Sequence, residues 1–383
     1  MQSPHRWFGA GHSTAPDLAK AGAEAAASAV EGRSPSLVIV FCSTRTDLPA
    51  MLLAVRHEVG ADATVVGCTG FAEVGNDSVS VGGVAVAALG GVGFTVRTEV
   101  SHVREVGHRA AGAAAAGAMA AVDSPHRALI MLCDGRSGDP HEVVRGAYSV
   151  LGATVPLVGG FAGDLTQTLQ FFNETIHEDA VIGIALGSDA PIGIGLAHGW
   201  HRLEPPMIIT KSSGGRIDEI DDEPALDVLL RRNGFPGGKA GDIFRYPETL
   251  QLLGLSRRSG EDIRALNSGN DVTRSIEGGA DFPQGALCWL MGGDHDSLIK
   301  GAVESCQEAL GGLDGRPPLG VLAFDCDGRR NKLGPDGATE AVQAMREAFG
   351  RTPFAGFYTA GEIARVRGAL GTHHLTLVTV ALA

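Results

Sequence analysis

An internal repeat constrains the fold of this 383-residue chain more than any other feature of its sequence. Three short apolar runs end in a cysteine that an arginine follows three residues later, at Cys42, Cys133 and Cys326. Each run is followed by an amphipathic helical pattern, a glycine-rich strand with an acidic turn, and a closing apolar strand. Strands that alternate with helices form sheets with crossover connections, so we predict an α/β fold of mixed sheets, built from a repeated βαβαββ unit.

The repeat also predicts how the chain divides into domains. Two copies of the unit fill residues 1–190, which we expect to form the first domain. The second domain, residues 191–383, opens with a mixed β/α segment at 191–284 that does not fit the repeat. The third copy then follows at 285–383, and we expect residues 286–293 to be its first strand.

Composition excludes several classes of protein. Acidic residues outnumber basic ones by 44 to 31, a net charge of −13, which disfavours binding to nucleic acid or to an anionic membrane. The most apolar long stretch, residues 180–200, is interrupted by Ser188, Asp189 and Pro191, so we expect no membrane insertion. The opening residues MQSPHRW lack the apolar segment of a signal peptide, and six cysteines are too few for a disulfide scaffold. We therefore expect a cytoplasmic protein.

The arginines of the three cysteine motifs, Arg45, Arg136 and Arg329, are candidates for binding an anion. Each follows the carboxyl end of an expected strand and precedes a helix, which is where open α/β sheets bind their ligands. A guanidinium group can hold a carboxylate through two parallel hydrogen bonds. The alternative is structural: the cysteine packs as a small apolar residue and the arginine pairs with a nearby acid.

Acidic residues in the glycine-rich turns are the second set of candidates. They follow a leading glycine by five or six residues and are Glu73, Asp164 and Glu362. A carboxylate there could hold a ligand ammonium while an arginine holds its carboxylate, which suits an amino acid; the alternative is that the acids cap turns. In the same turns, Tyr358 and Thr359 offer hydroxyl groups and Cys68 offers a thiol, although a buried, inert cysteine is the alternative for Cys68.

Sequence signatures of enzymes and metal sites are missing. The chain has no P-loop, no nucleophile-elbow motif and no metalloprotease motif. The adjacent His373 and His374 begin a strand and would face opposite sides of it, so they do not suggest one metal site. We expect no metal, no cofactor and, on balance, no catalysis.

The motifs GCTGFAEV, GGFAGD, KSSGGRIDEIDDEPALDVL and GFYTAGEI, in this order, resemble the FIST family with its FIST N and FIST C domains. The resemblance covers nearly the whole chain. It implies a two-domain sensory protein of signal transduction that binds a small ligand such as an amino acid, with a separate partner protein supplying the output. Some relatives are regarded as haem-binding gas sensors. Haem binding, an enzyme acting at the acidic turns and a protein-interaction scaffold therefore remain the alternatives.

Overall fold

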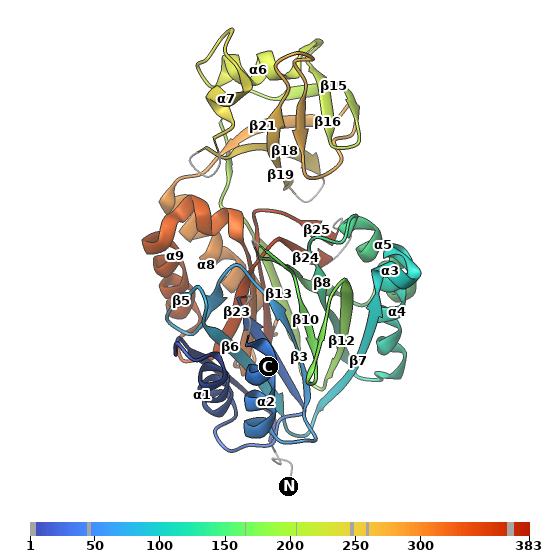
Figure 1. The fold of residues 1–383 in the computed structure, drawn as a ribbon, viewed down its shortest axis with the longest axis vertical. Helices are drawn as coiled ribbons and strands as arrows, with labels where there is room; N and C mark the ends of the chain where they lie inside the picture. Colours follow the sequence, from blue (N-terminus) through green and yellow to red (C-terminus); the bar gives the residue numbers. More distant parts are fainter. Residues whose placement is uncertain are drawn as a thin grey trace. The chain divides into compact units, whose positions relative to one another are not determined.

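The computed structural model describes residues 5–43, 47–164, 166–203, 205–245, 249–257, 260–365 and 371–383. The described residues form two compact units. The first unit takes residues from 1–198, 299–330 and 335–383, and the second takes residues from 199–298 and 331–334. The predicted α/β class is confirmed, because helices and mixed sheets alternate along the chain (Figure 1).

The first unit contains three six-stranded sheets that share one strand order. The first sheet consists of β1 (Trp7–Ser13), β6 (Val84–Gly90), β2 (Leu37–Cys42), β3 (Thr64–Thr69), β10 (Gln170–Phe172) and β11 (Thr175–His177). The second consists of β7 (Phe94–His102), β12 (Ala180–Ser188), β8 (His126–Asp134), β9 (Leu157–Ala162), β24 (Gly361–Arg365) and β25 (Gly371–His373). The third consists of β13 (Ile192–Ala197), β26 (Leu377–Leu382), β22 (Gly320–Cys326), β23 (Phe354–Thr359), β4 (Glu73–Val74) and β5 (Val79–Ser80).

The three sheets exchange their terminal hairpins in a cycle. In each sheet the third and fourth strands are parallel and the remaining neighbours are antiparallel. The last two strands come from elsewhere in the chain: β10 and β11 join the first sheet, β24 and β25 the second, and β4 and β5 the third. Whether the three segments arose by duplication stays a prediction, but their sheets are built to one plan.

Helices cover one face of each sheet, and the other faces meet in a common core. The pairs of helices are α1 (Leu18–Val30) with α2 (Leu48–Val59), α4 (His108–Gly117) with α5 (Pro140–Leu151), and α8 (His295–Gly311) with α9 (Asp327–Phe349). The short helices α3 (Val103–Val106) and η1 (Ala118–Ala121) flank α4. Buried residues from all three sheets, among them Phe41, Leu132 and Phe324, form one apolar cluster. Burial of this shared face stabilises the three sheets as one unit.

The third sheet corrects one sequence prediction. We expected residues 286–293 to be the first strand of the third copy, but β13 holds that place, and β21 (Leu287–Gly292) belongs to the second unit. β13 takes this place because its glycines allow close packing against α8. A Cβ at Gly193 would lie only 1.9 Å from the Ala309 carbonyl oxygen of that helix. Gly9 on β1 is related in the same way to the Ala29 carbonyl oxygen of α1.

The second unit is a closed ring of strands inserted in the chain between β13 and α8. Around the ring the order is β15 (Met207–Ser213), β16 (Arg216–Ile220), β20 (Ile276–Gly278), β19 (Gly260–Gly269), β18 (Gln251–Arg257) and β21, which pairs again with β15. Short strands β14 (His201–Arg202) and β17 (Glu223–Pro224) and helices α6 (Ala225–Arg232) and α7 (Ala240–Ile243) complete it. Its interior is apolar, as in other small barrels. The division of the chain into domains at residue 190 stays a prediction, and the compact units divide it differently.

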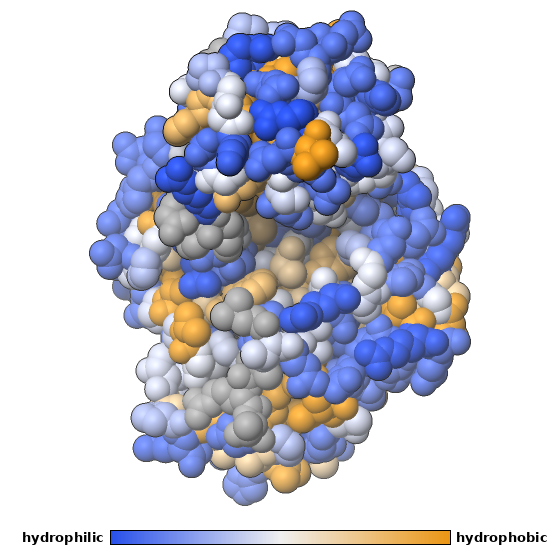
Figure 2. All heavy atoms as spheres, turned by 45° about the horizontal axis from the view of Figure 1, so that its top comes forward, coloured by the Kyte–Doolittle hydropathy of each residue, from blue (hydrophilic) through white to orange (hydrophobic). Residues whose placement is uncertain are grey.

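Among the described residues, no helix is both long and apolar enough to cross a membrane. On the face drawn in Figure 2, hydrophilic side chains predominate and the hydrophobic ones form separate patches.

Candidate functional site

Strand register identifies equivalent positions in the three sheets. A glycine lies in the middle of the second parallel strand of each sheet, at Gly67, Gly159 and Gly356. These glycines pair with Val40, Met131 and Ala323 of the neighbouring parallel strand. Three residues further along that strand, at its carboxyl end, the register places a polar or thiol side chain in each case: Ser43, Asp134 and Cys326. We call these the strand-end positions.

The same glycines pair with the exchanged hairpins, and this pairing defines a second set of positions. The residues opposite the glycines are Val74, Phe171 and Ile363. The residues that precede them, which we call the hairpin positions, are Glu73, Gln170 and Glu362. Sequence spacing selected Asp164 for the second copy, but the register assigns Gln170. Asp164 accepts hydrogen bonds from the amide and hydroxyl of Thr166, at 2.8 and 2.9 Å, as a turn cap does.

Glu73 is fully buried and accepts three hydrogen bonds. Its carboxyl oxygens accept hydrogen bonds from the Ser43 hydroxyl at 2.7 Å, the Ser80 hydroxyl at 2.8 Å and the Gly83 amide at 2.9 Å. Burial raises the pKa of Glu73 to about 7, although the three hydrogen bonds oppose the shift. The side chain therefore ties its hairpin to the first sheet and does not reach solvent.

Glu362 has the same role in the third copy. It accepts hydrogen bonds from the Thr359 hydroxyl at 2.5 Å and from the Thr376 amide and hydroxyl at 3.1 and 2.7 Å. Burial raises its pKa to about 8. The predicted ligand contacts Thr359 and Glu362 thus bind each other inside the protein, and both are fully buried.

The second copy differs in where its carboxylate lies. Gln170 accepts a hydrogen bond from the Ala180 amide at 3.0 Å, as Glu73 does from Gly83, but its side chain is neutral. The acid of this copy is Asp134, at the strand-end position. Asp134 is only half-buried and lines a cavity.

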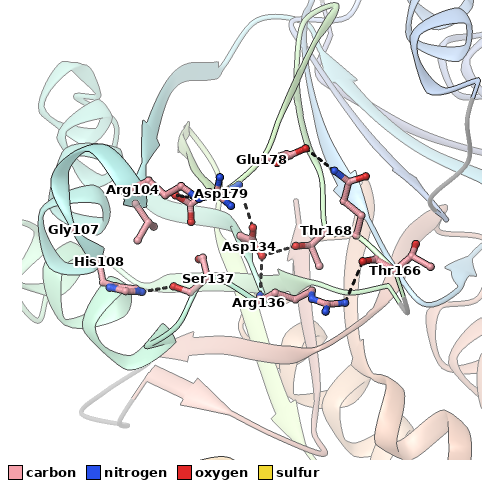
Figure 3. A pocket seen from close by; sticks show the side chains of 12 residues that line it. Arg104, Gly107, His108, Asp134, Arg136, Ser137, Thr166, Thr168, Glu178 and Asp179 are labelled. Carbon is pink, nitrogen blue, oxygen red and sulfur yellow. Dashed lines mark hydrogen bonds and ion pairs between the residues drawn. The ribbon is translucent and has the colours of Figure 1, made fainter.

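This cavity has a volume of about 510 Å³ and lies at the carboxyl end of β8 (Figure 3). Three segments enclose it: the start of α3 and α4, the turn between β8 and α5, and the residues on either side of the β10–β11 hairpin. Its walls are Val103, Arg104, Gly107, His108, Asp134, Arg136, Ser137, Thr166, Gln167, Thr168, Glu178 and Asp179. A volume of this size is typical of small-molecule sites, and the end of a parallel strand pair is where such sites form.

Charges of both signs face the cavity. The Arg104 side chain is largely exposed, and its Nε lies 3.7 Å from a carboxylate oxygen of Asp179, which is buried. The Arg136 side chain is also exposed, and its Nη1 donates to the Thr166 carbonyl at 3.3 Å. Glu178 accepts a hydrogen bond from the Gln167 amide at 2.6 Å. Of the predicted site residues, Arg136 is the one that this cavity includes.

The left-handed backbone conformation of Asp179 recurs at the equivalent positions of the other two copies. Its φ of 56° matches the positive φ at the equivalent positions, 87° at Gly82 and 61° at Leu375. At each position the backbone amide hydrogen-bonds the strand-end side chain: Asp179 to Asp134 at 3.1 Å, Gly82 to Ser43 at 3.0 Å, and Leu375 to the Cys326 sulfur. In all three copies the strand-end side chain is thus held by the same backbone amide.

Arg329 and Tyr358 lie in the interior of the first unit. The Arg329 Nε donates to Asp325 at 2.8 Å and its Nη1 to the His198 carbonyl, and the side chain is fully buried. Burial raises the pKa of Asp325, and the Arg329 charge opposes that shift. Tyr358 is also fully buried. In the third copy the arginine of the cysteine motif therefore has the structural role, because it pairs with a nearby acid instead of facing a ligand site.

Arg136 and Arg329 do not share a site. Arg136 follows β8 in the second sheet, whereas Arg329 follows β22 in the third, and no residue of β22 or α9 lines the cavity. Arg45 lies outside the described residues. The third motif is also one residue out of register, because Cys42 and Cys133 are equivalent to Asp325 and not to Cys326.

Cys68 is fully buried in the core that the three sheets share. Burial raises the pKa of its thiol well above the ordinary value. A buried, protonated thiol is a poor nucleophile, so its environment favours the inert alternative.

The lining of this cavity does not suit haem. Haem needs an apolar pocket with an axial ligand. The cavity walls carry charged or polar side chains apart from Val103 and Gly107, and the His108 Nε2 is already bonded to the Ser137 carbonyl. Within the described ranges, no group of three or more histidine, cysteine or acidic side chains is placed to hold a metal.

Fold and cavity together define an α/β protein with a mixed-charge, ligand-sized cavity at the end of β8. The FIST N domain model matches residues 36–223 and the FIST C domain model matches residues 225–365. The chain therefore belongs to the FIST family, whose domains are sensor domains of signal transduction. The two family matches meet at residue 224, within the second compact unit.

Full-length relatives occur in mycobacteria. The uncharacterised protein Rv0628c of Mycobacterium tuberculosis H37Rv is 26% identical over 96% of this chain and 97% of its own length. The uncharacterised protein Mb0898c of Mycobacterium bovis is 26% identical with the same coverage. The likeness extends through both family domains.

Proposed function

We propose that this chain is a sensor that binds a small anionic or zwitterionic metabolite, of the amino acid class, in the cavity beside Asp134 and Arg136. The observation that carries the proposal is the cavity itself. It has a volume of about 510 Å³, and it exposes guanidinium groups and carboxylates to one space. Membership of a family of sensor domains supports the same conclusion.

Arg136 and Arg104 are the groups that would bind the anionic end of the ligand. Both side chains are exposed at the cavity, on opposite sides of Asp134 in sequence and on different elements (Figure 3). Hydrogen bonds from a guanidinium to a carboxylate are charge-assisted and each contribute about 1.5–3 kcal/mol. Because the two arginines lie on separate segments, a bound carboxylate would connect α3 to the β8–α5 turn.

The signalling role that follows is regulation of a separate partner protein. The compartment we propose is the cytoplasm, since all six cysteines are buried and none forms a disulfide. Ligand binding that connects α3 to the β8–α5 turn would then change the surface available to the partner.

Isothermal titration with a panel of amino acids and small carboxylic acids tests the proposal. We expect at least one of them to bind the wild-type protein, and Arg136→Gln to weaken that binding by tenfold or more. Arg145→Gln is the matched control, because Arg145 is exposed on α5 and pairs with Glu142 outside the cavity. Equal affinity in the wild type and in Arg136→Gln would remove Arg136 from the site, and a panel without any binding would refute the proposal.

A further inference from the structure

From a comparison of the three equivalent clusters we infer that Asp134 binds a cationic group of the ligand. The ligand class is then a small molecule with an ammonium or similar cation beside its carboxylate, and simple carboxylates or phosphates are excluded. This inference rests on the proposed function and narrows its ligand.

Each pair of strand-end and hairpin residues contains one carboxyl group, but its position differs. The strand-end and hairpin residues are Ser43 with Glu73 in the first copy and Cys326 with Glu362 in the third. In both, the carboxyl is at the hairpin position, fully buried and bound by three donors of the protein, so no ligand can reach it.

In the second copy the residue types are exchanged, giving Asp134 at the strand end and Gln170 at the hairpin. The exchange moves the carboxylate from the interior to the wall of the cavity. Gln170 is neutral, so the carboxyl of this pair is the one at the cavity wall, within reach of a ligand.

Asp134 also has capacity left for a ligand. Its carboxylate accepts hydrogen bonds from the Arg136 amide at 2.7 Å, the Asp179 amide at 3.1 Å and the Thr168 hydroxyl. An ionised carboxylate has about four acceptor sites, so one remains. Within the described residues, no cationic side chain forms an ion pair with Asp134, whereas the neighbouring Asp179 already has Arg104. A ligand cation would supply the missing charge.

The other two copies provide the design of the test. The double variant Asp134→Ser/Gln170→Glu rebuilds in the second copy the pair that the first copy has in Ser43 and Glu73. The fold accommodates that pair there, so we expect a folded protein whose cavity has lost its acid. Asp134→Asn is the second variant, which removes the charge and leaves Gln170 unchanged. Arg145→Gln is again the control.

The probes are the twenty amino acids, each compared by calorimetry with the carboxylic acid that lacks its α-amino group, such as alanine with propionate and glutamate with glutarate. For the wild type we expect the amino acid that binds to exceed its deaminated analogue by about tenfold to hundredfold, the range for a hydrogen bond to a charged group. In both Asp134 variants we expect that preference to disappear.

Three results would overturn the inference. Equal binding of amino acid and deaminated acid to the wild type would refute a cation site and leave the proposed function standing. A preference that persists in Asp134→Asn and in the double variant would place the cation elsewhere. Absence of binding by every probe would refute the proposed function and this inference with it.

Discussion

Replacing Glu362 by glutamine should remove most of the alkaline destabilisation of the first unit. Glu362 is fully buried, and burial raises its pKa from 4.5 to about 8. The folded protein therefore holds the neutral acid at pH 6, while the unfolded chain ionises. Gln170, the natural residue at the equivalent position of the second copy, shows that the fold accepts a neutral amide there.

The magnitude follows from linkage. A group with a raised folded pKa contributes stability below its unfolded pKa of 4.5, and that stability is lost as the pH rises through its folded pKa. The loss is about 1.4 kcal/mol for each pH unit until the folded pKa is reached. For a folded pKa of about 8, Glu362 should lower the free energy of unfolding by about 3 kcal/mol between pH 6 and pH 9. Glu73, with a pKa of about 7, should add roughly half as much over the same interval.

The assay is urea unfolding of the wild type, Glu362→Gln and the control Glu347→Gln at pH 6, 7, 8 and 9. Glu347 is exposed on α9 and should leave the pH dependence unchanged. We expect the curve for Glu362→Gln to be flatter than that of the wild type by about 3 kcal/mol over this range. Equal pH dependence in the wild type and Glu362→Gln would show that Glu362 is not a buried neutral acid.

Three further predictions concern buried and closely packed residues. Arg329→Met should lower the free energy of unfolding, measured in urea, by about 3–5 kcal/mol, because it leaves Asp325 buried without its cation. Adding Asp325→Ala to this variant should recover part of the loss, and no recovery would contradict the pairing. Gly193→Ala should lower the free energy of unfolding by about 1–3 kcal/mol, since its Cβ would meet the Ala309 carbonyl oxygen at 1.9 Å. Gly241 has open space around it, so the control Gly241→Ala should not lower the free energy of unfolding. All six cysteines should resist iodoacetamide in the native protein and react after unfolding, because all are buried; rapid labelling of Cys68 in the native state would contradict its place in the core.

Local patterns in the sequence predict the elements of the first unit, because helix and strand periodicity depends on neighbours in the chain. The strands that end at Cys42 and Asp134, and the helices that follow them, lie where periodicity indicates. The exchange of hairpins is different in kind. Nothing near Glu73 in the sequence shows that it pairs opposite Phe357, since that contact joins segments almost 300 residues apart.

The candidate site was predicted only where spacing along the chain matches spacing in the sheet. Arg136 follows β8 directly, so its position at the strand end was predictable. Asp164 was selected by its distance from Gly159, but the second copy has a longer connection before its hairpin, and Gln170 takes the equivalent place. The cavity residues Arg104, Asp134 and Asp179 were missed. The one signal for Asp134 in the sequence was its place in the second cysteine motif, directly after Cys133.

The inserted second unit explains the remaining error. Its strands separate β13 from α8 by about a hundred residues, so the strand nearest in sequence to α8 was taken for the first strand of the third copy. The alternating glycines at Gly9 and Gly11 and at Gly193 and Gly195 mark the true equivalence, because each pair faces the backbone of a helix.

A crystal structure of the protein grown with the amino acid that binds most tightly in the titration panel would test the central claim most directly. The account predicts density for the ligand in the cavity at the end of β8, with its carboxylate at Arg136 and its ammonium at Asp134. Ligand density at any other place, or a bound ligand whose ammonium makes no contact with Asp134, would contradict it.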